Sequence, residues 1–274
     1  MPKVSPVMSS LIFWSLLLLI LWWGVRRFER LNLYFPEKNL YGSPADYGLG
    51  YEAVRLVTAD GKQLGAWYIP PVEDKAKVVI MSHGNGGNRC YRLAKQALFS
   101  SLGCGVLSYD YRGYGDSQGS PSEKGTYLDV QAAYDWLAAE KKIAPERVVS
   151  FGESLGCAMA LELALKRPVR ALIMESPFTS VEEMGKVYFP FLPVKLMVSF
   201  KYDNKSKISS LKAPVLIIHS PDDEIVPFRM GRELFEKAPE PKAFLEIRGT
   251  HNDGYQMSEK VYKVGIKKFL EDLP

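Results

Sequence analysis

The chain has 274 residues, of which 47% are hydrophobic, 12% aromatic and 24% charged. This ordinary globular composition argues against a largely disordered chain. A formal net charge of +4 without a dense Lys/Arg block argues against a nucleic-acid partner, and three cysteines without a C-x-x-C pair indicate neither a disulfide framework nor a zinc site.

The N-terminal region contains nineteen residues, 7–25, without a charged side chain. As a helix this run is about 28 Å long, close to the thickness of a bilayer's hydrocarbon core. Aromatic and then basic residues close the run, as is typical of a membrane interface: Trp22, Trp23, Arg26, Arg27 and Arg30. We therefore expect a single-pass membrane anchor at residues 1–30.

Two other interpretations of this run are weaker. A cleavable signal peptide has a shorter apolar segment and a small-residue cleavage site, whereas this run ends in Trp-Trp-Gly-Val-Arg-Arg. A core helix of a soluble domain would carry more polar positions among so many aromatic side chains. The remaining chain then divides into a Pro- and Gly-rich connector at 31–50 and one domain at 51–274, whose motifs are described below.

The domain at 51–274 opens with a predicted β-hairpin. Its strands are Glu52–Val57 and Gln63–Ile69, and the pair Asp60-Gly61 between them is typical of a tight turn.

Short apolar runs then alternate with helical patterns. The predicted strands are Val78–Ser82, Gly105–Tyr109, Val148–Phe151, Ala171–Glu175, Val215–His219 and Ala243–Ile247. The predicted helices are Tyr91–Ser101, Glu123–Glu140, Leu155–Lys166, Phe228–Lys237 and Ser258–Leu270. This alternation predicts an α/β fold with a mostly parallel central sheet and helices on both faces. Ligands of such sheets bind at the carboxyl ends of the strands.

The sharpest motif is Gly152-Glu153-Ser154-Leu155-Gly156, between a predicted strand and a predicted helix. In this context G-x-S-x-G is typical of a nucleophile elbow, in which a strained serine projects its hydroxyl from the sheet edge. The alternative is a glycine-rich turn with an incidental serine. We predict that Ser154 is a catalytic nucleophile.

A glycine-rich loop, 83–88, follows the strand Val78–Ser82 directly. Acyl transfer requires two N–H donors where negative charge develops, and glycines allow backbone N–H groups to come close. We assign these donors to the backbone of Asn85 and Leu155. A phosphate-binding loop is the alternative, but the G-x-x-x-x-G-K-[ST] pattern is missing, and we expect no cofactor and no metal.

The chain has three histidines, so the general base can be chosen by elimination. His83 belongs to the glycine-rich loop and precedes the serine. In folds with such a nucleophile elbow the catalytic serine, acid and histidine follow one another along the chain in that order. His251, which comes after the last strand, is therefore the predicted base. For His219, at the end of a strand, we favour a structural role.

The predicted acid is Asp223, with Asp222 as the second choice. A carboxylate just past a strand can hold the imidazole tautomer and stabilise the imidazolium. Carboxylates at this position also cap the following helix, which is the alternative interpretation.

Together these motifs resemble α/β-hydrolases of the serine-aminopeptidase-like (hydrolase-4-like) group, and within it small membrane-anchored members. The motifs that carry the resemblance are H-G-N-G-G-N at 83–88, D-Y-R-G-Y-G-D-S at 110–117, G-E-S-L-G at 152–156, D-D-E-I-V-P at 222–227 and T-H-N-D at 250–253. The resemblance implies the triad Ser154, Asp223 and His251, and a loop-ordering role for Asp110 and Arg112. The pair His219-Ser220 departs from the group's usual H-G and leaves Asp223 aligned.

The sequence thus predicts a serine hydrolase that cleaves ester, thioester or amide bonds of small acyl or lipid-like substrates, with a carboxylesterase or thioesterase favoured. The alternatives are a serine-aminopeptidase-like peptidase and a catalytically inactive membrane scaffold. A short cap is predicted at about 177–214. Its aromatic residues are candidates for an acyl pocket or for lipid contact, and the alternative, favoured for any single one, is a cap helix that packs on the core: Tyr188, Phe189, Phe191, Phe200 and Tyr202.

Overall fold

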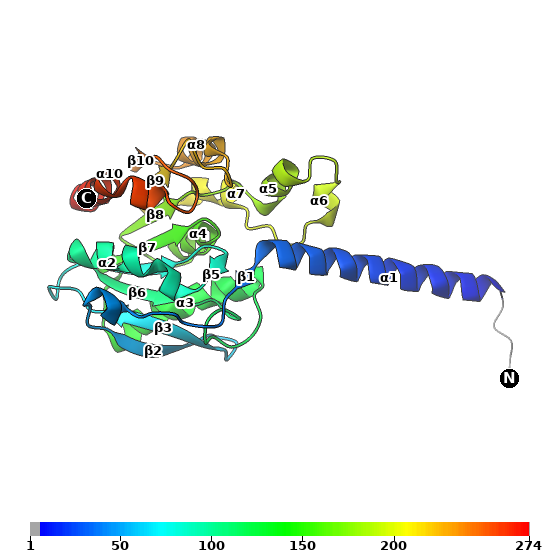
Figure 1. Ribbon diagram of the computed structural model, residues 1–274, viewed down its shortest axis with the longest axis horizontal. Coiled ribbons are helices and arrows are strands. Elements are labelled where there is room, and N and C mark those ends of the chain that lie inside the picture. Colours follow the sequence, from blue (N-terminus) through cyan, green and yellow to red (C-terminus); the bar gives the residue numbers. More distant parts are fainter. Residues whose placement is uncertain (1–5, 274) are drawn as a thin grey trace.

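The computed structural model describes residues 6–273, and within them the predicted catalytic domain, 51–274, is built on one eight-stranded sheet. The strands follow the order β10-β9-β8-β7-β4-β6-β3-β2 (Figure 1). They are β2 (Glu52–Val57), β3 (Gln63–Ile69), β4 (Val78–Ser82), β6 (Gly105–Tyr109), β7 (Val148–Glu153), β8 (Ala171–Glu175), β9 (Val215–His219) and β10 (Lys242–Glu246). Strands β10 to β6 are parallel, whereas β3 and β2 are added antiparallel at one edge.

The apolar runs predicted as strands are buried on both faces of the sheet. All five residues of β4, β6, β8 and β9 are buried. Because side chains alternate along a strand, Val78 and Ile80 join the core on one face, and Val79 and Met81 join the core on the other. This burial explains why the strands are continuously apolar rather than amphipathic.

Helices cover both faces, as the sequence predicts (Figure 1). Helices α2 (Leu93–Ser101) and α10 (Glu259–Glu271) contribute to one core, and α3 (Glu123–Glu140), α4 (Gly156–Lys166) and α8 (Phe228–Lys237) to the cores opposite. Helix α2 begins two residues later than predicted, because residues 89–92 form a 3-10 turn in which the Asn88 side chain accepts the N–H of Cys90. Strand β10 is shifted by one residue from its predicted range, an ordinary uncertainty of element ends.

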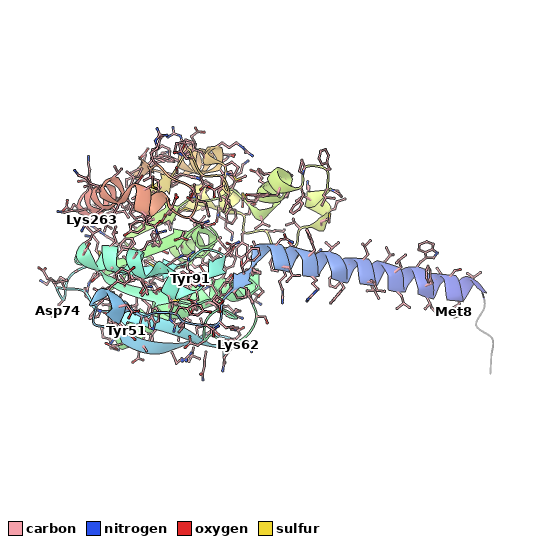
Figure 2. All side chains as sticks on the ribbon, viewed as in Figure 1. Met8, Tyr51, Lys62, Asp74, Tyr91 and Lys263 are labelled. Atoms are coloured by element: carbon pink, nitrogen blue, oxygen red, sulfur yellow. The ribbon has the colours of Figure 1, made fainter. Side chains whose placement is uncertain are left out.

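Helix α1 (Pro6–Leu33) projects from the catalytic domain (Figure 1). Within it Ser10–Leu33 is long and apolar enough to cross a membrane, with a mean hydropathy of 1.6 in a window that is not buried by the rest of the chain. Its side chains are uncovered over most of its length (Figure 2). The helix continues past the predicted anchor boundary at residue 30, and residues 1–5 of that predicted anchor lie outside the described residues.

The predicted connector and the predicted cap both approach the carboxyl edge of the sheet. In the connector, β1 (Phe35–Pro36) pairs in parallel with β5 (Gly86–Gly87), a strand of the glycine-rich loop. The cap segment 177–214 contains three short helices, α5 (Val181–Tyr188), α6 (Val194–Met197) and α7 (Asn204–Lys207). Helices α5 and α6 lie above the end of α1 in Figure 1.

Candidate active site

Ser154 lies in a sharp turn between β7 and α4. Its φ angle is +51°, a region that non-glycine residues rarely adopt, and its N–H donates to the carbonyl of Glu175 at 2.8 Å. A Cβ atom on Gly152 would lie 2.3 Å from the carbonyl oxygen of Gly156, and one on Gly156 would lie 2.0 Å from that of Ser82. The close approach of strand and helix therefore explains both glycines of the predicted elbow.

The predicted acid and base meet beside this turn. Nδ1 of His251 lies 2.8 Å from Oδ2 of Asp223. The other oxygen of this carboxylate accepts the N–H groups of Ile225 at 3.0 Å and Val226 at 2.8 Å. Because an ionised carboxylate only accepts, Nδ1 of His251 carries a proton and Nε2 is left to act as a base.

His219 is a second imidazole at this point. Its Nε2 lies 3.3 Å from Oδ2 of Asp223 and 3.1 Å from the carbonyl of Val226, and the ring is fully buried. Burial alone would raise the pKa of Asp223, but hydrogen bonds from His219 and His251 outweigh it and hold this pKa well below its usual range. The structural role predicted for His219 is thus a contact with the predicted acid itself.

Asn85 and Leu155, the predicted oxyanion donors, both line the same cavity as Ser154 and His251. Among the described residues, neither backbone N–H donates to another protein group. The carbonyl of Asn85 accepts from the N–H of Phe35 at 3.0 Å and from the hydroxyl of Tyr114 at 2.7 Å, which fixes the loop. The connector thus braces the glycine-rich loop, a role that sequence reasoning missed.

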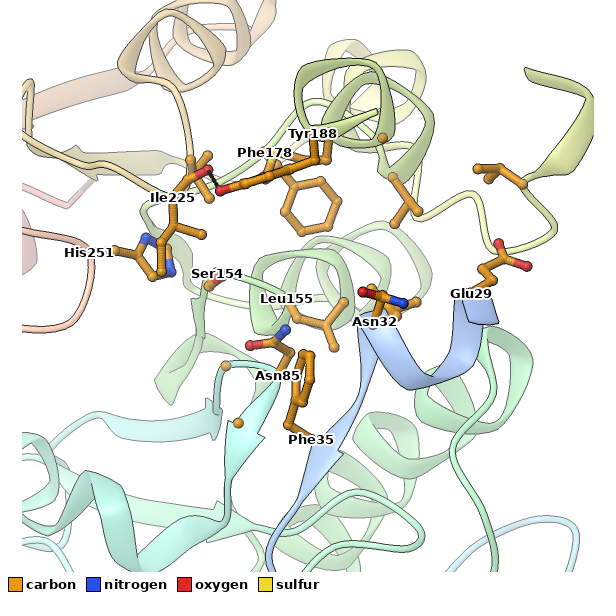
Figure 3. A pocket seen from close by; sticks show the side chains of 18 of the residues that line it. Glu29, Asn32, Phe35, Asn85, Ser154, Leu155, Phe178, Tyr188, Ile225 and His251 are labelled. Carbon is orange, nitrogen blue, oxygen red and sulfur yellow. Dashed lines mark hydrogen bonds between the residues drawn. The ribbon is translucent and has the colours of Figure 1, made fainter. Parts of the chain in front are cut away.

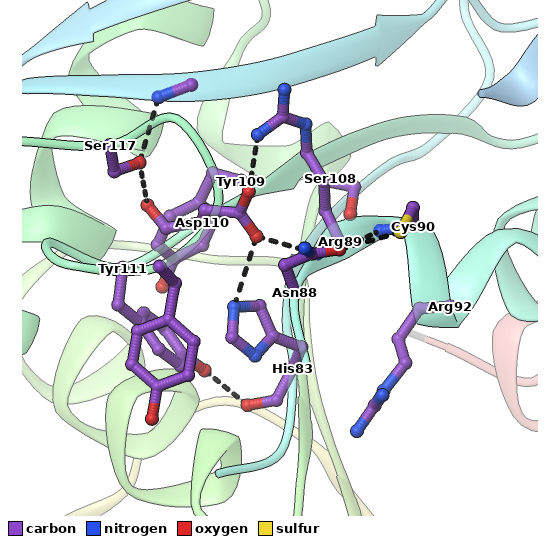
Figure 4. Close-up of polar contacts among 12 residues, drawn as sticks. His83, Asn88, Arg89, Cys90, Arg92, Ser108, Tyr109, Asp110, Tyr111 and Ser117 are labelled. Carbon is purple, nitrogen blue, oxygen red and sulfur yellow. Dashed lines mark hydrogen bonds and ion pairs between the residues drawn. The ribbon is translucent and has the colours of Figure 1, made fainter. Parts of the chain in front are cut away.

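His83 and Asp110 of the D-Y-R motif hold the loops behind the site in place (Figure 4). Nδ1 of His83 lies 2.7 Å from the carbonyl of Gly84. Asp110 accepts the N–H of Arg89 at 2.6 Å and pairs with its guanidinium, and Arg112 pairs with Asp129 at 2.8 Å. Neither Asp110 nor Arg112 lines the cavity, so their placement agrees with the loop-ordering role that the resemblance implies.

The cavity has a volume of about 650 Å³ and lies between the sheet edge, the cap and the end of α1 (Figure 3). Ser154 and His251 stand at one end of it, below Phe178 and Tyr188 in Figure 3. Most of its walls are apolar, which suits an acyl chain better than a charged ligand. Within the described residues, no group of three or more His, Cys, Asp or Glu side chains is arranged to hold a metal ion.

The five aromatic residues of the predicted cap have different environments. Tyr188 and Phe189 line the cavity, and the Tyr188 hydroxyl donates to the carbonyl of Ile225 at 2.8 Å. Phe191 is 98% exposed. Phe200 is half-buried and Tyr202 fully buried, so these two belong to the packing of the domain.

Helix α1 forms part of the cavity wall, which the sequence analysis did not predict. Val25, Phe28 and Leu33 line the cavity, and the rings of Phe28 and Phe189 are in edge-to-face contact at 5.6 Å. We call these residues of α1, together with α5 and α6, the outer wall. The sequence could not predict this role, because the anchor is apolar on all sides and has no polar face that would indicate which side the domain covers.

We call the part of the cavity formed by the turn at Ser154, with the predicted acid and base beside it, the floor. In contrast to the outer wall, the floor contains charged side chains that neutralise one another. Glu153, the residue before Ser154, pairs with Arg92 at 2.7 Å and with Lys95, and Lys95 also pairs with Glu175 at 2.8 Å. Burial alone would raise the pKa of Glu153, but the two cations outweigh it and hold this pKa well below its usual range. The negative charges of two carboxylates and the positive charges of two basic side chains thus neutralise one another next to Ser154.

Comparisons with known proteins agree with this architecture. A family model described as the alpha/beta hydrolase fold matches residues 77–197. An uncharacterized Mycobacterium tuberculosis protein is 37% identical over 246 residues, which cover 89% of this chain and 88% of that protein. Lysophosphatidylserine lipase ABHD12 of Macaca fascicularis is 34% identical over 216 residues; these cover 72% of this chain but only 54% of the lipase, about half its length.

The fold is also similar to that of a solved structure, an esterase of Pyrococcus furiosus. The TM-score is 0.75 at 21% identity, and the match covers 88% of this chain and 97% of the esterase. The comparisons identify the superfamily, while the narrower serine-aminopeptidase-like group remains a prediction from the motifs. With its fold, the family model and the similarity to a curated lipase in agreement, this chain belongs to the α/β-hydrolase family.

Proposed function

We propose that this α/β-hydrolase is a membrane-anchored serine esterase that cleaves acyl esters of lipids, with Ser154 as nucleophile, His251 as base and Asp223 as the orienting acid. One observation carries the proposal: Ser154 and His251 open into one apolar cavity, and buried Asp223 holds Nδ1 of His251 at 2.8 Å. An activated serine beside an apolar pocket is what acyl transfer from a lipid requires.

The mechanism follows from this geometry. His251 accepts the Ser154 hydroxyl proton on Nε2 while the oxygen attacks the ester carbonyl. The N–H groups of Asn85 and Leu155 hold the oxyanion, and its collapse expels the alcohol, which takes the proton from His251. Water then attacks the acyl-enzyme with His251 again as base, releasing the fatty acid and free Ser154.

The apolar cavity also argues for the substrate class. Its volume of about 650 Å³ is ample for a single acyl chain. The similarity to a protein named a lysophosphatidylserine lipase supports a lipid ester over a peptide. Helix α1 would hold the enzyme where such lipids reside, because its exposed apolar stretch matches a bilayer in length.

The test uses the full chain in phospholipid nanodiscs. Esters of one fluorogenic alcohol with acetate, octanoate and palmitate are compared with the matching thioesters and with aminoacyl amides, for the native protein and Ser154→Ala. We expect esters of medium and long chains to be cleaved faster than acetate, and only by the native protein. A flat chain-length profile, or preference for aminoacyl amides, would contradict the lipid-esterase proposal.

A further inference from the structure

The cavity that contains Ser154 does not end at the outer wall. A second groove runs between α1 and α6, lined on α1 by residues from Ser15 to Arg26 and on α6 by Leu196 and Met197. Val25 and Met197 line both the cavity and this groove. The two hollows therefore meet, and we call the second one the lateral groove.

The lateral groove follows the predicted membrane span. Ser15 and Val25 are ten residues apart in a continuous helix, so the groove extends about 15 Å along the α1 axis. That distance is about half of a hydrocarbon core. A chain lying in the groove would remain at the depth of the lipid tails while its ester end approaches Ser154.

The cap carries its own apolar surface beside this groove. Phe191 is 98%, Leu196 83% and Leu192 44% exposed, and we call these three residues the cap tip. Clustered exposed apolar side chains of this size mark an interaction surface. Leu196 also lines the groove opposite Trp22, whose ring stacks under Arg26 at 5.7 Å, an arrangement typical of the membrane interface.

The cap is attached to α1 directly. The Glu29 carboxylate accepts the N–H of Ser199 at 2.7 Å and that of Phe200 at 2.8 Å, as well as the Ser199 hydroxyl at 2.5 Å. Because the Glu29 side chain is only 10% exposed, these charge-assisted bonds fix the cap against the anchor. The lateral groove therefore lies between two elements, α1 and the cap, whose relative position is fixed by hydrogen bonds.

We propose that the lateral groove is the entrance for the acyl chain of a bilayer lipid, and that the cap tip lies in the same leaflet. The lipid then reaches Ser154 along α1 without first leaving the membrane. This inference rests on the proposed esterase function and on the proposed anchor. It adds the path by which the substrate reaches Ser154 and states that the substrate is a lipid still in the bilayer.

The first experiment locates the cap tip. Because Cys90, Cys104 and Cys157 are all buried, a thiol-reactive fluorophore will select an introduced cysteine. Leu196→Cys is labelled in the full chain in phosphatidylcholine vesicles, with Val57→Cys on β2, 66% exposed, as the aqueous control. We expect nitroxide-bearing lipids to quench the label at 196 and iodide to quench the label at 57; iodide quenching at both positions would overturn the proposal.

The second experiment tests the route. Val25→Trp narrows the junction of groove and cavity, whereas Ile20→Trp introduces the same side chain at a position of α1 outside the groove lining. The readout is the rate on palmitoyl lysophospholipid in vesicles divided by the rate on a soluble butyrate ester. We expect Val25→Trp to lower this ratio at least about tenfold, equivalent to losing the burial of two methylene groups, and Ile20→Trp to preserve it.

The outcomes separate this inference from the proposals beneath it. Equal ratios for Val25→Trp and Ile20→Trp, with lipid hydrolysis intact, would overturn the lateral entrance and leave the esterase. No hydrolysis of either ester by the native protein would refute the esterase itself. A label at Leu16→Cys, at the midpoint of the uncharged run 7–25, that iodide quenches would refute the anchor and the entrance together.

Discussion

The floor and the outer wall of the cavity are built in opposite ways. Around Ser154 the backbone itself is closely packed, so that a Cβ on Gly156 would lie 2.0 Å from a carbonyl oxygen. In the outer wall a Cβ on Gly185 of α5 would meet side-chain atoms of Val194, the nearest a methyl group at 2.6 Å, and beside the wall a Cβ on Gly24 of α1 would meet no described atom within 4 Å. The floor contains compensated charges, and the outer wall is apolar and partly exposed. The difference separates two tasks: chemistry requires groups held in fixed positions, and supply of an apolar substrate requires a surface that water does not compete for.

Replacing the nucleophile breaks the floor's chemistry most severely. We expect Ser154→Ala to lower kcat on a long-chain ester by a factor of about 10⁵–10⁶, because no other group then starts the reaction. Stopped assays over days against the uncatalysed rate measure this loss. Ser101→Ala, at the end of α2, is the matched serine control; activity of Ser154→Ala near that of Ser101→Ala would refute the assignment.

The next largest effect concerns the acid. We expect Asp223→Asn to lower kcat by about 10⁴, because an amide no longer selects the His251 tautomer or stabilises its cation. Glu224→Gln is the control, since the Glu224 carboxylate accepts only the backbone N–H of His251, at 2.9 Å, and its loss should stay within about tenfold. Equal losses in steady-state kinetics of the two variants would contradict the choice of acid.

The ion pairs of the floor predict a stability effect with a defined pH dependence. Glu153→Gln leaves Lys95 and Arg92 without a shared carboxylate and should cost about 3–5 kcal/mol of unfolding free energy at pH 7. Because the pKa of Glu153 is lowered in the folded state, its stabilisation is full above the unfolded pKa, about 4.3, and is lost as the pH falls through the folded pKa.

Thermal unfolding of the full chain in one detergent, between pH 7 and pH 3, checks this prediction. The native protein should lose more stability on acidification than Glu153→Gln does. Glu182→Gln removes an exposed pair with Lys186 and should change the unfolding free energy by about 0.5 kcal/mol or less. Indistinguishable melting of both variants at pH 7 would show that the floor's charges are not coupled as described.

The two glycines give a direct test of packing. Gly156→Ala should destabilise the domain by about 2–3 kcal/mol, because a methyl group overpacks the junction with β4. Gly24→Ala should cause no loss, since its methyl group meets no neighbour and alanine favours the helix. Denaturant unfolding with matched detergent compares the two variants, and equal destabilisation would mean that the turn around Ser154 is packed no more closely than the uncovered length of α1.

The smallest expected effect lies in the outer wall. Tyr188→Phe removes the hydroxyl that donates to Ile225 at 2.8 Å and should raise KM for a long-chain ester by up to about fivefold. Michaelis kinetics separate this change from kcat. A loss in kcat as large as that of Asp223→Asn would place Tyr188 in the chemistry rather than in the wall.

Most of the floor could be predicted from the sequence, since its signals are local. Strands such as β4 and β9 have the bounds that their apolar runs predict, because buried strands in a parallel sheet are apolar throughout. From the order of the motifs we predicted that Ser154, Asp223 and His251 lie at one edge of the sheet. In the structure Asp223 contacts His251. The second imidazole on Asp223 could not be predicted, because it depends on how β9 and its following loop fold together.

The outer wall could not be predicted, because its contacts join distant segments. Glu29 meets Ser199, a residue 170 positions away, and nothing near either residue indicates the pairing. Phe191, Phe200 and Tyr202 are similar in type but range from fully exposed to fully buried, because the path of the cap decides which side chain faces the core. The amino-acid composition of the cap therefore does not reveal which of its aromatic side chains line the cavity, pack in the core or are exposed for contact with lipid.

The most direct test of the central claim is labelling by a fluorophosphonate probe, which phosphonylates an activated serine. Intact-mass measurement of the full chain in nanodiscs is compared for the native protein, Ser154→Ala and Asp223→Asn. Our account predicts one adduct on the native protein, none on Ser154→Ala and much slower labelling of Asp223→Asn. A folded native protein that forms no adduct, or an adduct that persists in Ser154→Ala, would contradict it.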